Sequence, residues 1–284
     1  MKNSYKPFFI CFLSLFILTN ILKAQQIQMP SPSPLATFEQ RVGLTDVVIS
    51  YSRPGVKGRI IFGDLVPFDK LWRTGANMAT KIEFSDDVKI QGKDLKAGAY
   101  ALFTIPGKDS WTIIFNTNYN QGGIGQYTEA EDVLRVSVAP EKMAEKMETF
   151  TIDINDITDS SANLWILWEN TAVSVRIDVD VDEKVMADIQ RVLDPSSDAG
   201  NYFMAATYYY NTDRDLDQAL AWVNKSIELG NKRFWVVHLK ANILKKKGDC
   251  PEAVKAAEES KTLAKEAGND DYVALNDNLI ASCK

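Results

Sequence analysis

The apolar pattern of this chain changes its period at residue 182. Before that point, the segment Val173–Val181 places an apolar residue at every second position, which predicts a β-strand with one buried face. After it, apolar residues recur at helical spacing, as in Val185, Ile189 and Val192. Because the two periods bury their apolar faces in different ways, the chain should fold as two structurally different regions in succession.

Residues 35–181 predict an antiparallel β-sandwich or jelly roll. Short runs rich in β-branched and aromatic residues alternate with turns such as Pro106–Asp109 and Asn170–Thr171. No helical pattern long enough to connect parallel strands occurs before residue 182. The predicted strands are Asp46–Ser52, Thr80–Phe84, Val88–Ile90, Ala99–Ile105, Trp111–Asn116, Val133–Ala139, Thr149–Ile154, Asn163–Trp168 and Val173–Val181.

Residues 182–284 predict an all-α region built like tetratricopeptide repeats. The motif Asp215–Leu220 is followed 34 residues later by Asp249–Val254, and Ser226 recurs as Ser260. A period of about 34 residues is that of tetratricopeptide helix pairs. In the first pair, Ala205, Ala206, Tyr209 and Tyr210 fit the small-then-aromatic pattern of the first helix if its turn carries one extra residue, and in the second pair Ala241 and Leu244 fill those places. A generic helical bundle with a chance period is the alternative.

Two repeats bury too little core to stand alone. Helices at 182–193 and Asp270–Cys283 are therefore expected to pack at either end of them. Cys250 precedes the expected helix Pro251–Ala267, and Cys283 ends the antiparallel helix that follows it. Since the two helices are of similar length, a Cys250–Cys283 disulfide is our hypothesis. Two separate thiols are the alternative.

Residues 1–24 predict a secretion signal, which a linker at 25–34 follows. A basic start precedes an apolar run at 8–22, and cleavage is expected between Ala24 and Gln25. The run is shorter than the roughly 20 residues that a bilayer span needs, which disfavours a membrane anchor. We therefore expect a protein exported to the periplasm or beyond the cell, with no membrane span after cleavage.

The charge of the chain argues against nucleic acid as a partner. The formal net charge is −6, and removing residues 1–24 takes away three lysines and no acid, so the mature chain is more negative still. Nucleic-acid binding needs a basic footprint, which this balance does not provide.

Several classes of chemistry are also disfavoured. The β region has no histidine and no cysteine, which excludes nucleophilic catalysis of the Ser/His/Asp and Cys/His kinds there. The only histidine, His238, lies among Phe234, Trp235 and Val237 and is interpreted as a packing residue. No phosphate-binding glycine loop and no metal-ligand spacing occurs, so we expect no cofactor and no metal.

A long loop with three arginines is the leading candidate for a site. Arg53, Arg59 and Arg73, with Trp72 and Asn77, can form a pocket for an anion or a sugar. Arginine offers a planar fork of donors and tryptophan offers a stacking face.

The alternative for this loop is structural. In it the arginines pair with acids and fix the loop on the sheet. The acids in question are Glu83, Asp64 and Asp132. Our interpretation divides the three, with Arg53 and Arg59 bracing the loop and Arg73 meeting a ligand.

Residues 30–180 carry a series of distinctive short motifs. They are Gly43-Leu44-Thr45-Asp46, Tyr51-Ser52-Arg53-Pro54, Lys57-Gly58-Arg59, Phe62-Gly63, Leu65-Val66-Pro67, Trp72-Arg73-Thr74-Gly75-Ala76-Asn77, Gly98-Ala99-Tyr100 and Trp111-Thr112-Ile113-Ile114. With these motifs the chain resembles a bacterial exported family known only as a domain of unknown function, DUF2911. The resemblance implies export and a β region with a helical extension. It implies no activity and no catalytic residues.

These observations favour a non-catalytic binding protein. Its β region would hold the ligand pocket, and its helical repeats would present a concave surface to a protein or peptide. The alternative is an envelope glycan hydrolase that uses carboxylates near Asp132 and Glu169, since glycosidases work with two opposed carboxyl groups.

Overall fold

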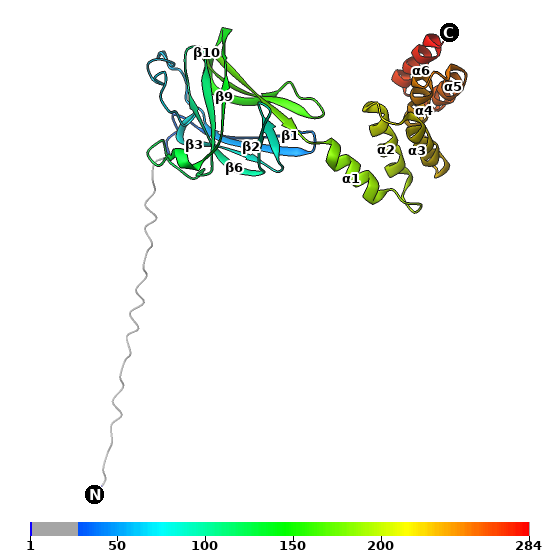
Figure 1. The fold of residues 1–284 in the computed structure, drawn as a ribbon, viewed down its shortest axis with the longest axis horizontal. Coiled ribbons are helices and arrows are strands. Elements are labelled where there is room, and N and C mark those ends of the chain that lie inside the picture. Colours follow the sequence, from blue (N-terminus) through cyan, green and yellow to red (C-terminus); the bar gives the residue numbers. More distant parts are fainter. Residues whose placement is uncertain (2–27, 284) are drawn as a thin grey trace.

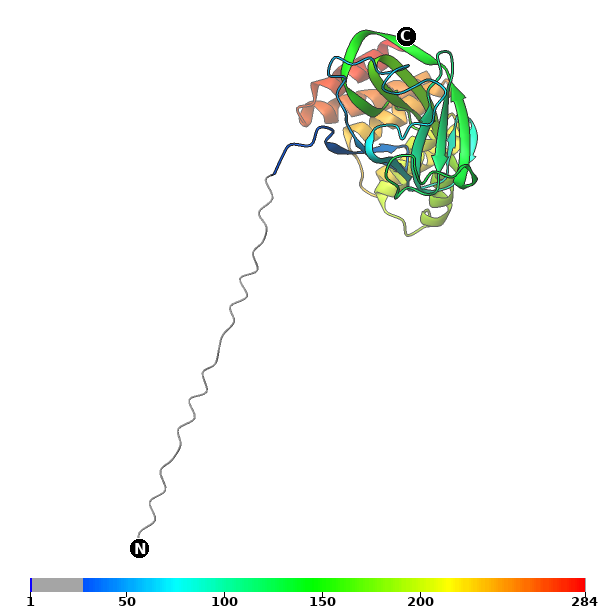
Figure 2. The same ribbon diagram turned by 90° about the vertical axis from the view of Figure 1, so that its left-hand side faces the viewer.

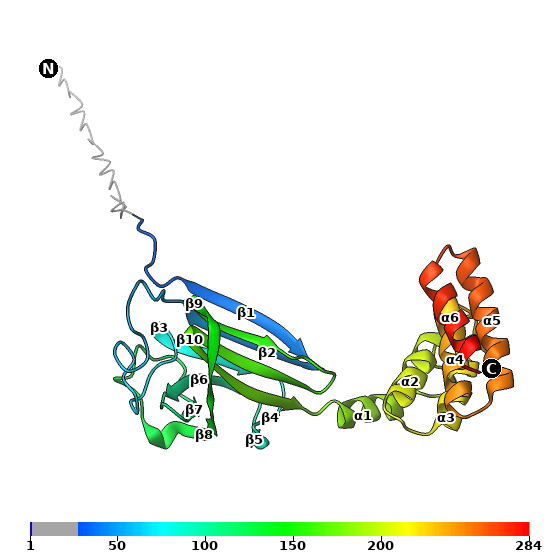
Figure 3. The same cartoon turned by 90° about the horizontal axis from the view of Figure 1, so that it is seen from above.

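The structure is a computed structural model that describes residue 1 and residues 28–283. The predicted signal sequence, with its cleavage point between Ala24 and Gln25, lies outside the described residues. Within them, antiparallel strands come first and six helices follow (Figure 1). Figures 1 and 3 show the strands at one end of the molecule, the helices α2–α6 at the other, and α1 between them.

The strands form two sheets. Their bounds are β1 (Leu35–Val42), β2 (Thr45–Ser52), β3 (Ala76–Phe84), β4 (Val88–Ile90), β5 (Lys93–Leu95), β6 (Gly98–Ile105), β7 (Trp111–Asn116), β8 (Asp132–Val138), β9 (Pro140–Asn155) and β10 (Ser161–Val179). One sheet has the order β1-β2-β3-β6-β7-β8 and the other β5-β4-β10-β9, and every pairing is antiparallel. Figure 2, seen from the left-hand side of Figure 1, places these strands in front of the helices.

Both sheets contribute to one apolar core. Ile49 and Ile82 from the first sheet are fully buried beside Val175 from the second. Tyr51 adds a polar link, because its hydroxyl donates to the carbonyl of Ile152 and accepts from the same residue's N–H, both at 3.0 Å. The prediction of two packed antiparallel sheets is therefore confirmed.

The strand bounds differ from the prediction in the second sheet. Asn163–Trp168 and all but the last two residues of Val173–Val181 belong to one long strand, β10, and the turn predicted at Asn170–Thr171 is wrong. The register with β9 shifts there, and Glu169 takes a positive φ of 54°. Asn170 and Thr171 thus lie in an irregular part of the β9–β10 pair, and the chain does not reverse direction there.

Two strands were missing from the prediction. β1 is an edge strand in which exposed and half-buried residues alternate, but the polar Gln40 interrupts the apolar series Ala36, Phe38 and Val42 on its inward face. β5 has three residues, too few to show a period. Pairing with a neighbour, rather than any local pattern, makes each of them a strand.

The helices of the second region pack in pairs. They are α1 (Asp182–Val192), α2 (Ala199–Asn211), α3 (Leu216–Glu228), α4 (Phe234–Lys246), α5 (Cys250–Glu266) and α6 (Asp270–Ser282). Asp198 caps α2 as its side chain accepts from the N–H of Asn201, which fixes the start of that helix.

The 34-residue period corresponds to equivalent contacts in two helix pairs. Ser226 on α3 donates to the carbonyl of Ala199 at the start of α2, at 2.6 Å. Ser260 on α5 donates to the carbonyl of Phe234 at the start of α4, at 2.7 Å. Both serines are fully buried. The repeat is therefore structural, whereas the tetratricopeptide identity of the pairs stays a prediction.

The two ends of the helical region behave differently. Cys250 and Cys283 form a disulfide between the start of α5 and the end of α6, with Cα atoms 5.3 Å apart. At the other end, α1 has no fully buried residue, but its Asp182 accepts from the Tyr208 hydroxyl of α2 at 2.6 Å and pairs with Arg214, and the packing of 182–193 as an end helix of the repeats stays a prediction. Only Asp180 and Val181 separate the end of β10 from the start of α1.

Candidate functional site

The arginine loop, residues 53–75 between β2 and β3, is folded over the end of the sandwich that lies away from α1 (Figures 1 and 3). Its apolar residues Val56, Ile61 and Val66 are buried in the shared core. Trp72 exchanges two main-chain hydrogen bonds with Thr104 of β6, at 2.8 and 2.9 Å. These contacts give the loop a fixed shape, as its apolar composition requires.

Thr74 fixes the chain directly after Arg73. This threonine is fully buried and has φ 55°, a left-handed conformation that β-branched residues rarely adopt. Its hydroxyl donates to that of Thr104 at 3.1 Å, and its carbonyl accepts from Thr80. Such strain persists only where surrounding contacts over-determine it, and it concentrates at functional sites. The position of Arg73 is therefore set by the buried structure rather than by loop flexibility.

Aromatic rings form the floor beneath the loop. The rings of Trp72 and Trp168 stack with an interplanar angle of 14° and centroids 5.8 Å apart. Phe62, Trp111 and Phe150 each meet Trp72 edge-on, with centroids 5.2–6.4 Å from its ring. Trp72 is thus a member of an aromatic cluster, with one face of its ring stacked on Trp168.

A cavity of about 390 Å³ lies between the arginine loop and this floor. Volumes of roughly 300–1,000 Å³ are usual for small-molecule sites. Four cationic side chains line it, and none of its lining residues is acidic: Lys57, Arg59, Lys70 and Arg73. We call this cavity the basic pocket. Its existence in a chain of net charge −6 is a local departure from the overall balance.

Arg53 and Arg59 brace the loop, but not through acids. Arg53 donates from Nε to the carbonyl of Phe150 at 3.1 Å and from Nη2 to the Thr151 hydroxyl at 2.8 Å. Arg59 donates to the carbonyls of Val56 at 3.0 Å and Gly55 at 2.6 Å. Two of the acids expected as partners pair elsewhere, Glu83 with Lys81 and Asp132 with Arg135. The acceptors are thus carbonyl and hydroxyl oxygens, and no carboxylate would be orphaned by removing either arginine.

Arg73 differs from both. Its side chain lines the basic pocket and its Nε is buried without a hydrogen-bond partner. No carboxylate among the described residues forms an ion pair with it. Gly123, at φ 69°, comes so close that an added Cβ would lie 3.2 Å from Arg73 Nη1. The guanidinium is therefore packed in place without the acceptor that such a group normally has.

Asn77 does not line the pocket. Its amide donates to the carbonyl of Ser33 at 3.2 Å and to the hydroxyl of Ser52 at 3.1 Å. Pro32 and Ser33 form part of the pocket wall, and Lys57 donates to the carbonyl of Pro32 at 3.3 Å. Asn77 thus positions one wall rather than facing the cavity.

Four further lining residues were not singled out from the sequence: Lys57, Lys70, Trp168 and Ile124. The two lysines lie on the arginine loop itself, so their charge was a signal within the segment already under consideration. Trp168 lies on β10 and Ile124 on the loop after β7, and only folding brings them to the pocket. Trp168 is 2 % exposed, and its Nε1 is a second buried donor without a partner.

The two carboxylates of the hydrolase alternative, Asp132 and Glu169, do not form an open pair. Three side-chain donors surround Asp132. Asp132 accepts from Asn116 at 2.8 Å, from the Tyr127 hydroxyl at 2.7 Å and from Arg135 Nε at 2.7 Å. Burial and the hydrogen bond to Asp132 raise the pKa of Tyr127 to about 12. Neither Asp132 nor Glu169 lines any of the three cavities described for residues 28–283.

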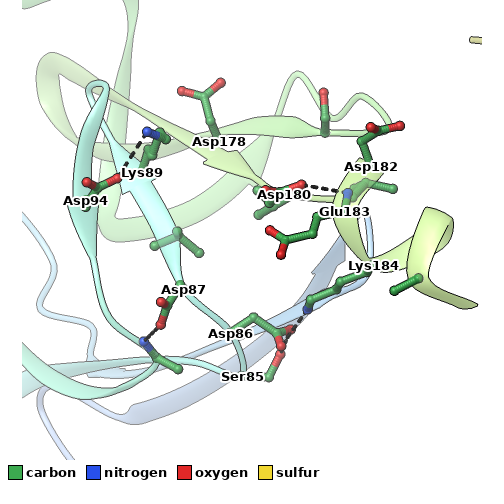
Figure 4. A pocket seen from close by; sticks show the side chains of 16 residues that line it. Ser85, Asp86, Asp87, Lys89, Asp94, Asp178, Asp180, Asp182, Glu183 and Lys184 are labelled. Atoms are coloured by element: carbon green, nitrogen blue, oxygen red, sulfur yellow. Dashed lines mark hydrogen bonds and ion pairs between the residues drawn. The ribbon is translucent and has the colours of Figure 1, made fainter.

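A second cavity, of about 840 Å³, lies where β10 leads into α1 (Figure 4). We call it the acidic cavity. Two lysines and seven acidic residues line it: Asp86, Asp87, Asp94, Asp178, Asp180, Asp182 and Glu183, with Lys89 and Lys184.

Most of these carboxylates have protein partners. Lys184 pairs with Asp86 at 2.6 Å and Lys96 with Asp87 at 2.7 Å, and Asp180 caps α1 through the N–H of Glu183. The Lys184 ammonium holds the pKa of Asp86 below its ordinary value. The acidic cavity is therefore a set of satisfied contacts that hold α1 to the β region.

The described residues were also compared with the requirements of a metal site and of a membrane-spanning helix. Within residues 28–283, no group of three histidine, cysteine, aspartate or glutamate side chains is placed to hold a metal ion. No helix in that range combines the length and the apolar character that a membrane crossing requires.

Comparison with known proteins gives one match. A family model described as "Protein of unknown function (DUF2911)" matches residues 33–177, about half of the chain. The match covers the whole basic pocket except Pro32. No curated protein and no solved structure matches.

Proposed function

This chain belongs to the DUF2911 family, whose function is unknown, and we propose that it is a non-catalytic binding protein whose basic pocket takes a small anion. The observation that carries the proposal is Arg73. Its guanidinium lines a cavity, its Nε is buried without a partner, and no described carboxylate pairs with it. A ligand oxyanion is the partner that this arrangement lacks.

The chemistry of the lining favours an anion over a neutral sugar. Sugar hydroxyls both donate and accept hydrogen bonds, so a sugar site needs acceptor side chains as well as donors. The basic pocket has no Asp, Glu, Asn or Gln side chain among its lining residues. Two nearby carbonyls are also taken, that of Gly55 by Arg59 and that of Gly75 by Trp72. An oxyanion only accepts, so it matches a pocket that mainly donates.

Isothermal titration with a panel of anions and neutral sugars tests this proposal. The panel is phosphate, sulfate, acetate, citrate, glucose and N-acetylglucosamine. We expect at least one anion to bind and the neutral sugars not to bind. Arg73→Ala should weaken the anion roughly 10- to 150-fold, the value of about 1.5–3 kcal/mol for a hydrogen bond to a charged group.

Matched variants separate a local effect from a general change of charge. Arg73→Lys keeps the charge but loses the fork, so it should retain only part of the affinity. Arg176→Ala removes an arginine that pairs with Asp178 away from the pocket and should bind as the wild type does. If no anion binds, or if Arg176→Ala and Arg73→Ala weaken binding equally, the pocket is not an anion site.

The helical region supplies the second part of the proposal, a surface for a protein or peptide partner. Support comes from apolar side chains left exposed on it, Met204 on α2 at 68 % and Leu275 on α6 at 46 %. The wild-type chain should co-purify a partner protein from envelope extract. Met204→Asp should reduce the recovery of that protein and leave anion titration unchanged. Equal recovery of that partner with both proteins would contradict this part.

Export is the third part. The basic start and the apolar run before Ala24 support a mature chain that begins at Gln25 in the periplasm or outside the cell. N-terminal sequencing of protein from the native envelope fraction checks it. Recovery of the chain with Met1 intact would overturn it.

A further inference from the structure

Two exposed apolar side chains line the basic pocket beside its exposed cations. Leu65 on the arginine loop is 44 % exposed and Ile124 on the loop after β7 is 48 % exposed, and both line the cavity. Each has an exposed apolar neighbour, Ile60 at 64 % and Met78 at 53 %. The N–H of Leu65 donates to the carbonyl of Ile60, and Met78 forms a β-bridge with Gly122.

Single exposed apolar side chains are ordinary on protein surfaces. These four, however, sit on three neighbouring segments, the arginine loop, β3 and the loop after β7, and Leu65 and Ile124 line one cavity. The lining continues the same character inward through Val66, Leu71 and the aromatic floor. The pocket thus offers two kinds of contact, cationic side chains on the one hand and aliphatic and aromatic carbon on the other.

We propose that the ligand is an amphiphilic anion, a phosphate or carboxylate group borne on an apolar body. The proposal rests on the proposed function, since it assumes that Arg73 receives the oxyanion. It adds that the apolar body lies against Leu65 and Ile124 and is withdrawn from water there. A bare inorganic anion would pair with the cations but leave the apolar surface of Leu65 and Ile124 exposed to water.

The small volume of the cavity limits the apolar body. At about 390 Å³ the pocket is in the lower part of the range for small-molecule sites, so it can bury a short apolar body but not one of unlimited length. Each buried methylene is worth roughly a fourfold gain in affinity. Affinity should therefore rise with chain length and then level off when further carbons pass the rim.

Titration of the full mature chain with two homologous series tests this. One series runs from inorganic phosphate through methyl, ethyl, butyl and hexyl phosphate, and the other from acetate to octanoate. We expect roughly fourfold tighter binding per methylene over the first carbons in the series that the protein prefers. The series with the tighter members identifies the oxyanion as phosphate or carboxylate.

Variants of the rim isolate the apolar contact. Leu65→Ser and Ile124→Ser should flatten the dependence on chain length and leave the shortest anion of the preferred series bound as in the wild type. Ile157→Ser is the matched control, because Ile157 is 45 % exposed on the β9–β10 loop and lines none of the described cavities. It should keep the full dependence.

The outcomes separate this inference from the proposed function. If affinity is independent of chain length in the wild type while Arg73→Ala still abolishes binding, the amphiphilic ligand is excluded and the anion pocket stands. If chain length matters equally in wild type and both rim variants, the apolar contact lies elsewhere and the inference is overturned. If no member of either series binds, the proposed function is overturned together with it.

Discussion

The basic pocket and the acidic cavity lie at opposite ends of the β region and use charge in opposite ways. At the acidic cavity, Asp86, Asp87 and Asp182 each have a cationic partner on a neighbouring element. At the basic pocket, Arg73 has no carboxylate partner among the described residues, and its buried Nε has no partner of any kind. The larger cavity is the one whose charges are satisfied.

This difference shows why cavity size alone is a poor guide to a binding site. Ion pairs that are complete within the protein have no need of a ligand, and exposed ones contribute little to stability. A buried donor without an acceptor is costly, and a ligand that supplies the acceptor recovers that cost. Arg73, whose buried donor has no partner, is therefore the better candidate for a site than the larger acidic cavity, whose charges are paired.

The largest expected effect concerns the floor of the basic pocket. Trp168→Ala removes a side chain that is 2 % exposed and stacked on Trp72, so it should destabilise the protein by about 3–5 kcal/mol. Chemical unfolding measures it. Trp165→Ala, on the half-buried opposite face of β10, is the control and should cost less. Equal losses would mean that the aromatic cluster is not a special part of the core.

The next effect sharpens the contrast between the two cavities. A bound anion at about 100 times its dissociation constant should stabilise the wild type by about 2.7 kcal/mol. At the same anion concentration the gain should fall to about 0.3–1.4 kcal/mol in Arg73→Ala, whose affinity is expected to be roughly 10- to 150-fold lower, and it should persist in Lys184→Ala, whose change lies at the acidic cavity. Thermal unfolding with and without the anion measures it. A stability gain that depended on Lys184 instead would place the anion at the acidic cavity and not at the basic pocket.

A smaller effect separates the three arginines. Arg53→Ala loses hydrogen bonds to Phe150 and Thr151 and should cost about 2 kcal/mol. Arg73→Ala loses no ion pair and should change the stability of the ligand-free protein by less than about 0.5 kcal/mol. Unfolding in urea without anions compares them. A large loss for Arg73→Ala would show that the guanidinium is a structural brace.

The smallest effect concerns α1. Lys184→Ala breaks the contact with Asp86 and should cost less than about 1 kcal/mol, because the Lys184 side chain is 38 % exposed. The pKa of Asp86 is lowered in the folded state by Lys184, so this contribution is present at neutral pH and is lost as the pH falls through the lowered pKa. The two proteins should therefore become equally stable well below pH 4. A difference that grew in acid would reverse this assignment.

The prediction of elements succeeded where a pattern is local. The alternation in Val173–Val181 and the helical stripe after residue 182 each report which face is buried, and both elements are found. It failed at β1, which forms only because β2 pairs with it, and at Asn170–Thr171, where long-range pairing absorbs a turn signal. Propensity is a weak signal when the partner lies elsewhere in the chain.

The candidate site shows the same limit. The sequence singled out Arg59, Trp72 and Arg73, and the structure places all three at the basic pocket. It also singled out Arg53 and Asn77, which hold the surrounding chain instead. Residue type was enough to find the loop, but the acceptors of Arg53 and Asn77 lie on segments that are distant in sequence.

The sequence by itself determined the order of the two regions, the repeat at 34 residues and the chemical character of the arginine loop, because period and composition are properties of neighbouring residues. Only the tertiary structure decided which arginine has a partner. Hydrogen-bond satisfaction is set by atoms that meet across the fold, and Phe150, Thr151 and Gly123 approach the loop from strands and loops far along the chain. For that reason three arginines that look alike in the sequence divide into two that donate to loop and strand oxygens and one, Arg73, whose buried Nε has no acceptor.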